Sequence, residues 1–283
     1  MRAVLQCGGS VAWARELRAP AWPLLPAGNR PLLEYWIELC VGLGVESVRL
    51  LLGDGAPYVE EYAGDGERWG VSIEYGFLKE GRPASAFLRR SPDRWKDGLL
   101  FVAGPVFPRR LTGTPIFDAA GRAPRAVRNE DGTVLCALSG PGPALDALRE
   151  RGEWPADEAA AFEDLGLRME PLRSLDDYYQ LNMSLVRGEM TRYLTPGYYA
   201  ADGSHIGYNV ILPASATVSA PLIIGNDCRL APLANVGPDV VIGSRVVVDG
   251  PCDVIRSVVL DGTYIGRGVE IDGKIVAGRR LVD

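Results

Sequence analysis

Apolar residues in the first two thirds of the chain form short runs, which are separated by longer stretches of mixed polarity. Continuous apolar runs of four to six residues are typical of strands that are buried on both faces of a parallel sheet. Such runs, which predict buried strands, lie at residues 3–6, 47–52 and 99–103.

Two further stretches complete this pattern. Residues 71–75 alternate between apolar and polar side chains and predict a half-exposed strand. Residues 31–43 predict a helix, because Pro31 suits a first helical turn and Gly44 suits the exit. The alternation of strands and helices predicts an α/β domain over residues 1–188, with a mixed, mostly parallel sheet that is covered on both faces. Ligands of such domains bind at the carboxyl ends of the strands.

The hydrophobic period changes to six in the last part of the chain, after an expected linker at 189–205. A hexapeptide period over residues 206–283 predicts a parallel solenoid of stacked coils. Three hexapeptides per coil give roughly four coils. Glycine follows several of the apolar positions, at Gly207, Gly225, Gly237, Gly243 and Gly266. The apolar positions are Ile206, Leu212, Val218, Ile224, Leu230, Val236, Ile242, Val248 and Val254, then Val259, Ile265 and Ile271 after one step of five.

Four segments carry a family resemblance. The first strand runs into CGGSVA at 7–12, and PLLPAGNRPLLEYW follows at 23–36. GDGERWGV at 64–71 and SLDDY at 174–178 come later, in the same order as in the family. The chain resembles the sugar-1-phosphate nucleotidyltransferases, also called sugar-nucleotide pyrophosphorylases. This resemblance implies a Rossmann-like α/β domain followed by a left-handed parallel β-helix.

The resemblance also implies a chemistry, whose residues the chain lacks. In the family a sugar 1-phosphate attacks the α-phosphate of a nucleoside triphosphate, with cations on the phosphates and a carboxylate-bound Mg²⁺. The family's Thr, Arg and first Lys correspond here to Val11, Ala12 and Trp22. Its glycine turn corresponds to Pro83, and its two metal-binding Asp residues correspond to Pro105 and Pro171. We therefore assign no catalytic residue and no metal ligand, and interpret these six positions as degenerate.

Parts of a nucleotide site remain. Gly8, Gly9 and Ser10 are interpreted as the remnant of a phosphate-binding loop. Arg30 replaces a family Lys and keeps its charge, so it is the candidate phosphate contact. Trp22 stacks on a base or fills the volume of the vacated pocket, and the sequence leaves both interpretations open.

Three function hypotheses follow. The first is a catalytically inactive homologue that has a regulatory or scaffolding role, or senses a nucleotide or nucleotide sugar. The second is an active nucleotidyltransferase that uses Mg²⁺ with relocated carboxylates, for which Asp54, Glu170, Asp176 and Asp177 are available. The third is a hexapeptide-repeat acyltransferase, whose only available histidine base is His205. The first hypothesis requires no cofactor.

Composition limits the location and the partners. Five scattered cysteines without a Cys-x-x-Cys pair indicate reduced thiols, and no signal or membrane-spanning segment is evident, so we expect a cytoplasmic protein. A net charge of −6 argues against nucleic-acid binding. The tail at 277–283 stays in the repeat phase and predicts an open edge. Either continuation of the native chain into a further domain or packing against another copy in a homo-oligomer would cover that edge. Pairing with an active homologue is the other expected partnership.

The repeat phase is testable by a pair of substitutions. Ile242→Asp places a carboxylate inside the coils without a partner and is expected to cost about 3–5 kcal/mol of unfolding free energy. Arg245→Asp, at an outward position of the same coil, is expected to stay within about 0.5 kcal/mol of wild type. Equal thermal midpoints for the two variants would show that the phase is misassigned.

Overall fold

The computed structural model of the 283-residue chain describes residues 1–9, 11–78, 85–88, 97–110, 125–128, 130, 132, 134–142, 146, 167–189, 198–199 and 203–282. The chain divides into two compact units. Unit 1 comprises 1–12, 19–24 and 32–173, and unit 2 comprises 13–18, 25–31 and 174–283. The helix that ends the predicted first domain thus belongs to unit 2. The predicted domain limits rest on periodicity and stay predictions.

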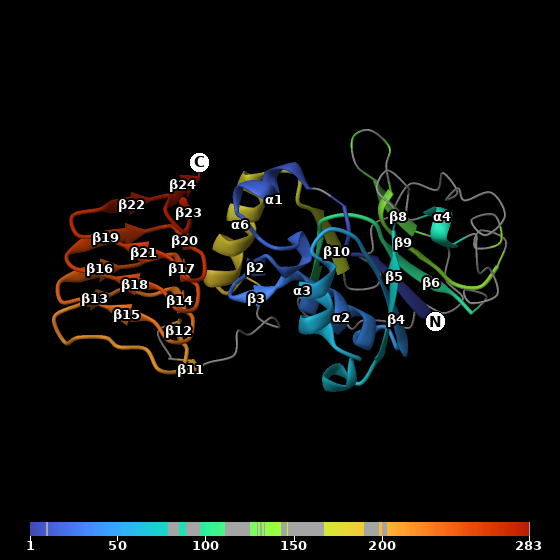
Figure 1. Ribbon diagram of the computed structural model, residues 1–283, viewed down its shortest axis with the longest axis horizontal. Coiled ribbons are helices and arrows are strands. Elements are labelled where there is room, and N and C mark those ends of the chain that lie inside the picture. Colours follow the sequence, from blue (N-terminus) through green and yellow to red (C-terminus); the bar gives the residue numbers. More distant parts are fainter. Residues whose placement is uncertain are drawn as a thin grey trace. The chain divides into compact units, whose positions relative to one another are not determined.

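A mixed six-stranded sheet forms the centre of unit 1 (Figure 1). Its order is β5-β4-β1-β6-β9-β8. The first four strands are parallel, while β6–β9 and β9–β8 are antiparallel. A mixed sheet was predicted, and the four predicted strands lie at the expected places. The strands are β1 (Arg2–Gln6), β4 (Ser47–Leu52), β5 (Ser72–Phe77), β6 (Leu99–Val102), β8 (Arg125–Arg128) and β9 (Val134–Ser139). A separate antiparallel pair consists of β7 (Val106–Arg110) and β10 (Leu167–Pro171).

Alternate residues of the sheet enter two separate apolar cores, because successive side chains of a strand point to opposite faces. Leu5 and Leu50 belong to the larger core, and Val4 and Leu51 belong to the smaller one. The larger core contains side chains of α2 (Leu32–Gly42) and α3 (Ala56–Ala63), and the smaller core contains Leu88 of α4 (Ser85–Leu88). Both faces are therefore covered, as expected. Other short helices in the described part of the N-terminal half are α1 (Ala12–Glu16), η1 (Trp22–Leu24) and η2 (Glu67–Trp69).

Unit 2 contains three sheets that the chain visits in rotation, so that each round adds one short parallel strand to each sheet. Ile206, Ile224 and Ile242 stand in register in the first sheet. This arrangement is compatible with the predicted β-helix. The first sheet contains β11 (Tyr198–Tyr199), β12 (Ser204–Ile206), β14 (Leu222–Ile224), β17 (Val240–Ile242), β20 (Val258–Val259), β23 (Ile275–Ala277) and β24 (Arg280–Val282). The second contains β13 (Thr217–Val218), β16 (Ala234–Val236), β19 (Cys252–Ile255) and β22 (Glu270–Asp272). The third contains β15 (Arg229–Leu230), β18 (Val247–Val248) and β21 (Tyr264–Ile265).

The predicted repeat phase is confirmed from Ile224 onward, where every predicted apolar position is buried. It is wrong for Leu212, whose side chain is 36% exposed. Leu212 lies in the first coil, and nearby Ile211 forms only an isolated bridge to Arg229, so this part of the chain lacks a full strand pair. The outward prediction for Arg245 is confirmed, and its pair with Asp261 at 3.5 Å is exposed.

The tail departs from the predicted phase. After β23 the chain reverses at Gly278, which has a φ of 64°, and β24 pairs antiparallel with β23. The first sheet thus ends in an antiparallel strand on both sides, since β11 pairs antiparallel with β12 at the other end. The expectation of an in-phase tail is therefore wrong for this sheet, while β24, β22 and β21 are the last strands of the three sheets at this end.

A hairpin and a helix of unit 2 pack on the coils. The hairpin consists of β2 (Pro26–Ala27) and β3 (Arg30–Pro31), and its two turn residues, Gly28 and Asn29, both have positive φ. The helix is α6 (Leu175–Val186). It starts at a capping box in which Asp177 N donates to Ser174 Oγ at 3.1 Å and Ser174 N donates to the Asp177 carboxylate at 3.0 Å. The prediction that 174–178 opens the last helix before the coils is confirmed.

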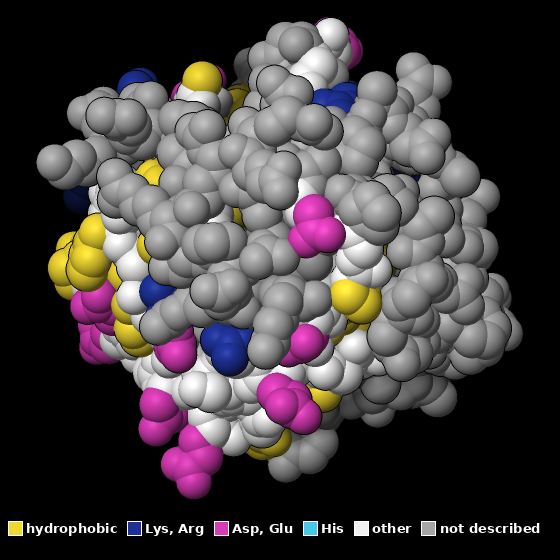
Figure 2. Space-filling model, turned by 90° about the vertical axis from the view of Figure 1, so that its right-hand side faces the viewer, with side chains coloured by type: hydrophobic (Ala, Val, Ile, Leu, Met, Phe, Trp, Pro, Cys, Tyr) yellow, Lys and Arg dark blue, Asp and Glu magenta, His cyan; other side chains and the backbone are white. Residues whose placement is uncertain are grey.

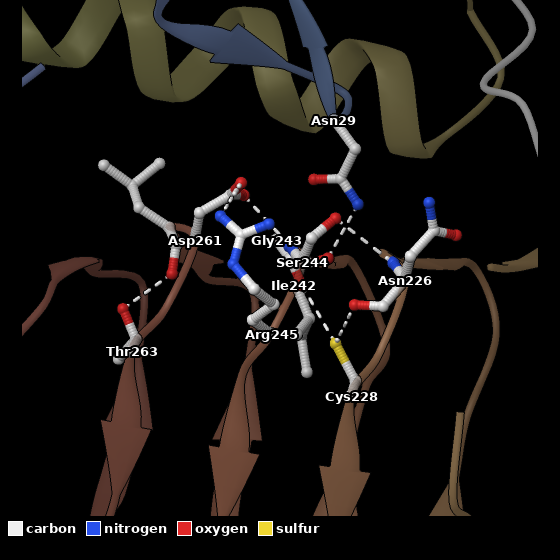
Figure 3. A network of polar contacts seen from close by, with 10 residues as sticks. Asn29, Asn226, Cys228, Ile242, Gly243, Ser244, Arg245, Asp261 and Thr263 are labelled. Atoms are coloured by element: carbon white, nitrogen blue, oxygen red, sulfur yellow. Dashed lines mark hydrogen bonds and ion pairs between the residues drawn. The ribbon is translucent and has the colours of Figure 1, made fainter. Parts of the chain in front are cut away.

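Hydrogen bonds that involve side chains fix this hairpin. The buried Asn182 amide accepts a hydrogen bond from Gly28 N at 3.0 Å and donates one to Tyr178 O at 2.9 Å. The Tyr178 hydroxyl donates to Pro26 O. Asn29 Nδ2 donates to the backbone oxygen of Ile242 in β17 at 2.7 Å (Figure 3). Hairpin, helix and coils therefore form one packed unit.

A ladder of polar side chains explains three of the repeat glycines (Figure 3). At one corner of the coils, Tyr208 N donates to Asn226 Oδ1 at 2.8 Å, Asn226 N to Ser244 Oγ at 3.2 Å, and Ser244 N to Asp261 Oδ1 at 2.9 Å. Each accepting side chain occupies the space where a Cβ would stand on Gly207, Gly225 or Gly243. Glycine at these positions therefore leaves room for the next coil's polar group.

Gly266 follows an apolar position in the same way, but a Cβ there would meet only Tyr264 Cε1 at 3.9 Å. A Cβ on Gly225 would lie 2.6 Å from Ser244 N. Gly225→Ala is therefore expected to lower the unfolding free energy by about 1–3 kcal/mol, as overpacking does. Gly266→Ala is expected to be neutral or stabilising by up to about 1 kcal/mol. Urea unfolding of both variants measures the difference, and similar losses would contradict the ladder's role.

Candidate functional site

The candidate site lies at the carboxyl ends of β1, β4 and β6. The chain proceeds from β1 to β4 and β5 on one side and then returns to β6 on the other side of β1. The order of strands reverses at this point, which is where ligands bind in open α/β sheets. Leu5 of β1 is level with Val102 of β6 and with Leu50 of β4, so the three following loops emerge at the same edge.

The glycine loop after β1 packs directly on the backbone after β4. Cys7 N and Gly8 N both donate to the Leu51 oxygen, at 2.8 and 2.9 Å. A Cβ on Gly8 would lie 2.6 Å from Gly53 N and 2.8 Å from Gly53 Cα. Gly8 is therefore required by a backbone-to-backbone contact, whatever its role toward a phosphate.

The rest of this loop has its own constraints. Gly9 has a φ of 95°, and Gln6 Nε2 donates to the oxygen of Gly8 at 3.2 Å. Burial raises the pKa of the Cys7 thiol to about 12, so this thiol is protonated and unreactive at neutral pH. Val11 is half-buried and Ala12 is exposed. Ser10, the third predicted loop residue, lies outside the described residues.

The loop after β4 also contacts the segment that contains Trp22. A Cβ on Gly55 would collide with Pro20 O and Ala21 Cβ, so this segment lies against the turn that follows β4. Trp22 itself is 8% exposed in η1. A buried indole suits the interpretation that Trp22 fills volume, and the alternative of base stacking stays a prediction.

The two positions that the resemblance assigns to the family's metal carboxylates are neighbours in the structure. Pro105 follows β6, and Pro171 ends β10, whose register pairs it with Val106. Leu172 N donates to Pro105 O at 2.8 Å, which closes this pairing. Two carboxylates here would be neighbours and could share a cation, but proline side chains carry no oxygen. The residues at these positions do not fit a Mg²⁺ ion, which prefers carboxylate and water oxygens.

Most of the carboxylates proposed as replacements have other partners. Glu170 forms an ion pair with Arg109 at 2.7 Å across the β7–β10 ladder. Asp177 belongs to the capping box of α6, and Asp176 accepts a hydrogen bond from Gln180 at 3.3 Å. Asp54 is exposed in the turn after β4. Among the described residues no group of three or more His, Cys, Asp or Glu side chains is placed to hold a metal ion.

Three predicted residues lie elsewhere or cannot be placed. Arg30 lies in the hairpin of unit 2 and is 9% exposed, so its assignment as a phosphate contact stays a prediction. His205 lies in β12, between β11 and β14, and burial lowers the pKa of its imidazole. Pro83 lies outside the described residues. All five cysteines are buried and free, as their spacing predicts.

Sequence reasoning missed Gly53 and Arg109. Gly53 directly follows the buried strand β4, and Gly8 comes two residues after the end of β1. A glycine at the end of a second strand is a signal for a close approach of the two backbones. Arg109 gave no signal, because its partner Glu170 lies far along the chain and the pairing depends on the β7–β10 register.

Comparisons with known proteins point to one class of enzyme. No known family model matches the chain. It is 33% identical over 84 residues to the glucose-1-phosphate thymidylyltransferase of Streptomyces antibioticus, covering 29% of this chain and 23% of that protein. It is 32% identical over 76 residues to the enzyme of the same name from Streptomyces griseus, covering 26% and 21%. The matched part thus spans less than a quarter of either relative.

A third similarity is longer and weaker. The UTP--glucose-1-phosphate uridylyltransferase of a Synechocystis strain is 22% identical over 324 aligned positions, covering 92% of this chain and 83% of that protein. Together these similarities support a relationship between the chain and the sugar-1-phosphate nucleotidyltransferases.

One face of the chain bears on other types of ligand. Figure 2 shows acidic side chains on the lower part of one face, and the described residues of that face form no broad basic patch. No helix within the described ranges is long and apolar enough to cross a bilayer. The prediction that the chain binds no nucleic acid stays a prediction.

The packing role of Gly8 is testable without a ligand. Gly8→Ala forces the β1 and β4 loops apart and is expected to lower the unfolding free energy by about 1–3 kcal/mol. The matched control is Gly104→Ala at the same edge, where a Cβ would meet only the flexible end of Leu135, Cδ2, at 2.8 Å. A loss below about 1 kcal/mol is expected for the control. Thermal unfolding of the ligand-free variants measures both, and a neutral Gly8→Ala would contradict the close contact.

Proposed function

We propose that this protein is a sugar-nucleotide pyrophosphorylase-like homologue without catalytic turnover, which binds a nucleotide sugar and acts as a regulatory or scaffolding subunit in sugar-nucleotide or polysaccharide metabolism. The observation that carries the proposal is the adjacent placement of Pro105 and Pro171, joined through the hydrogen bond from Leu172 N to Pro105 O at 2.8 Å. Phosphoryl transfer requires charge neutralisation, and these positions offer no metal ligand.

The charges on the phosphate side support the same conclusion. The resemblance places a cation at Ala12 and another at Trp22, and neither side chain is charged. Glu170 pairs with Arg109, so a shift of Glu170 to a metal would break an existing ion pair. The active alternative therefore requires ligands that these residues do not supply.

Retention of the frame supports binding of a ligand. The switch point of the sheet, the glycine loop after β1 and the glycine-rich turn after β4 keep the geometry in which α/β proteins bind nucleotides. The similar proteins are named for the transfer of thymidylyl or uridylyl groups to glucose 1-phosphate. We infer that UDP-glucose or dTDP-glucose, the products of those reactions, are the first ligands to test.

The fold of unit 2 completes the proposal. Its three parallel sheets support a β-helix, for which the family resemblance implies a left hand. A β-helix beside an inactive nucleotidyltransferase-like domain suits a role in assembly, either in a homo-oligomer or with an active homologue.

The proposal predicts no release of pyrophosphate above background when the protein is mixed with Mg²⁺, glucose 1-phosphate and UTP or dTTP. The double variant Pro105→Asp with Ala12→Arg is expected to remain inactive, because Pro171 still occupies the second carboxylate position. Calorimetric titration with UDP-glucose and dTDP-glucose tests binding separately. Turnover by the wild-type protein would overturn the inactive assignment, and binding of neither sugar nucleotide would overturn the sensing role.

A further inference from the structure

The central strand of unit 1 ends in a polar side chain. Gln6 is the last residue of β1 and follows Ala3, Val4 and Leu5, which are all buried. The residue level with Gln6 in β4 is Leu51, whose side chain is buried completely. An amide among apolar neighbours is costly unless its polar atoms have hydrogen-bonding partners. Gln6 is half-buried at the carboxyl edge of the sheet, so its amide needs such partners.

The glycine loop fixes the orientation of this amide. Gln6 Nε2 donates to Gly8 O at 3.2 Å, and a Cβ on Gly9 would lie 3.3 Å from the same nitrogen. If the amide were turned over, its oxygen would face the carbonyl oxygen of Gly8, and two acceptors would repel each other. The bond to Gly8 uses one N–H, and within the described ranges no group of the protein bonds the second N–H or the oxygen Oε1. The amide therefore presents one acceptor and one donor in a fixed order.

The surroundings of the amide on the sheet are apolar. Successive side chains of a strand point to opposite faces, so Gln6 lies on the same face as Val4, which belongs to the smaller core. Ala103 is half-buried, packs on the same core and lies one residue beyond the pair of Leu5 with Val102. A flat ring with a polar edge suits this place, because the ring can pack on apolar groups while its edge meets the amide.

We propose that the side-chain amide of Gln6 selects the base of the bound nucleotide, and that it selects uracil or thymine over cytosine. Uracil and thymine present a carbonyl acceptor beside an N–H donor, whereas cytosine presents an amino donor beside a nitrogen acceptor. Once sugar and phosphates fix the position of the base, an amide held in one orientation can satisfy only one of these edges. The similar proteins are named for thymidylyl and uridylyl transfer, which favours the carbonyl edge. This inference rests on the proposed function and deepens it, because it names the residue that discriminates between bases.

The test compares UDP-glucose with CDP-glucose by calorimetric titration, since these two ligands differ only at one edge of the base. The wild type is expected to bind UDP-glucose at least about 10-fold more tightly. Gln6→Met keeps the length of the side chain and removes both polar groups, so the ratio of the two affinities is expected to fall within about 2-fold of unity. A merely displaced loop would weaken both ligands alike and leave the ratio unchanged. The matched control is Gln180→Met, at an exposed glutamine of α6, and it is expected to keep the wild-type ratio.

The outcomes separate this inference from the proposed function. A wild type that binds both ligands equally, or prefers CDP-glucose, would overturn base selection and leave the sensing role in place. A wild-type ratio that survives in Gln6→Met, or is lost in the control as well, would overturn the assignment to Gln6. Binding of neither ligand by the wild type would overturn the proposed function and this inference with it. If circular dichroism shows that Gln6→Met is unfolded, Gln6→Glu decides the question, because a carboxylate has the same shape but no N–H. A folded Gln6→Glu protein that keeps the wild-type preference for UDP-glucose would also refute the proposal.

Discussion

The contact between the backbones of Gly8 and Gly53 governs the geometry of the carboxyl edge in unit 1. Parallel strands place their following loops side by side, but side chains normally keep the loop backbones apart. Here the absence of a Cβ on either residue lets the β1 loop donate two hydrogen bonds to Leu51 and rest on the end of β4. The turn after β4 then contacts Pro20 and Ala21, which fixes the segment leading to Trp22. A larger residue at position 8 would displace the edge as a whole.

Pro105 and Pro171 are informative as a pair, because they lie next to each other in the structure. Antiparallel pairing of β7 with β10 brings together two positions that are far apart in the sequence, as a shared metal ion would require. Proline at these positions removes the oxygen donors and keeps the backbone path, since the Pro105 carbonyl still accepts the bond from Leu172. Under the proposed function, backbone hydrogen bonding at this pair keeps the frame in which the family resemblance places two metal carboxylates, and similarity in fold does not settle activity.

Much of this architecture was predictable because it depends on local patterns. The runs at β4 and β6, the helix that ends near Gly44 and the inward phase from Ile224 to Ile271 follow from side-chain periodicity. The candidate site was less predictable. The sequence indicated that Gly8 matters but not that Gly53 is the reason, and the Arg109–Glu170 pair depends on a long-range register. The predictions for Leu212 and for the phase of the tail were wrong for another reason. The ends of a repeat array lack the neighbouring coils that a periodic rule assumes. Ser10 and Pro83 lie beyond what the structure describes.

The hairpin at residues 26–31 has a consequence for how the chain acquires its fold during synthesis. Its partners are Asn182 and Ile242, which are 154 and 213 residues further along the chain. At a translation rate of roughly 5–20 residues per second, Ile242 is synthesised roughly 10–40 s after Asn29, because 213 residues separate them. During that interval the hairpin lacks its native hydrogen bonds to α6 and β17. The hairpin therefore completes its native packing only after most of the last third of the chain has been translated, and until then residues 26–31 are exposed to chaperones and proteases.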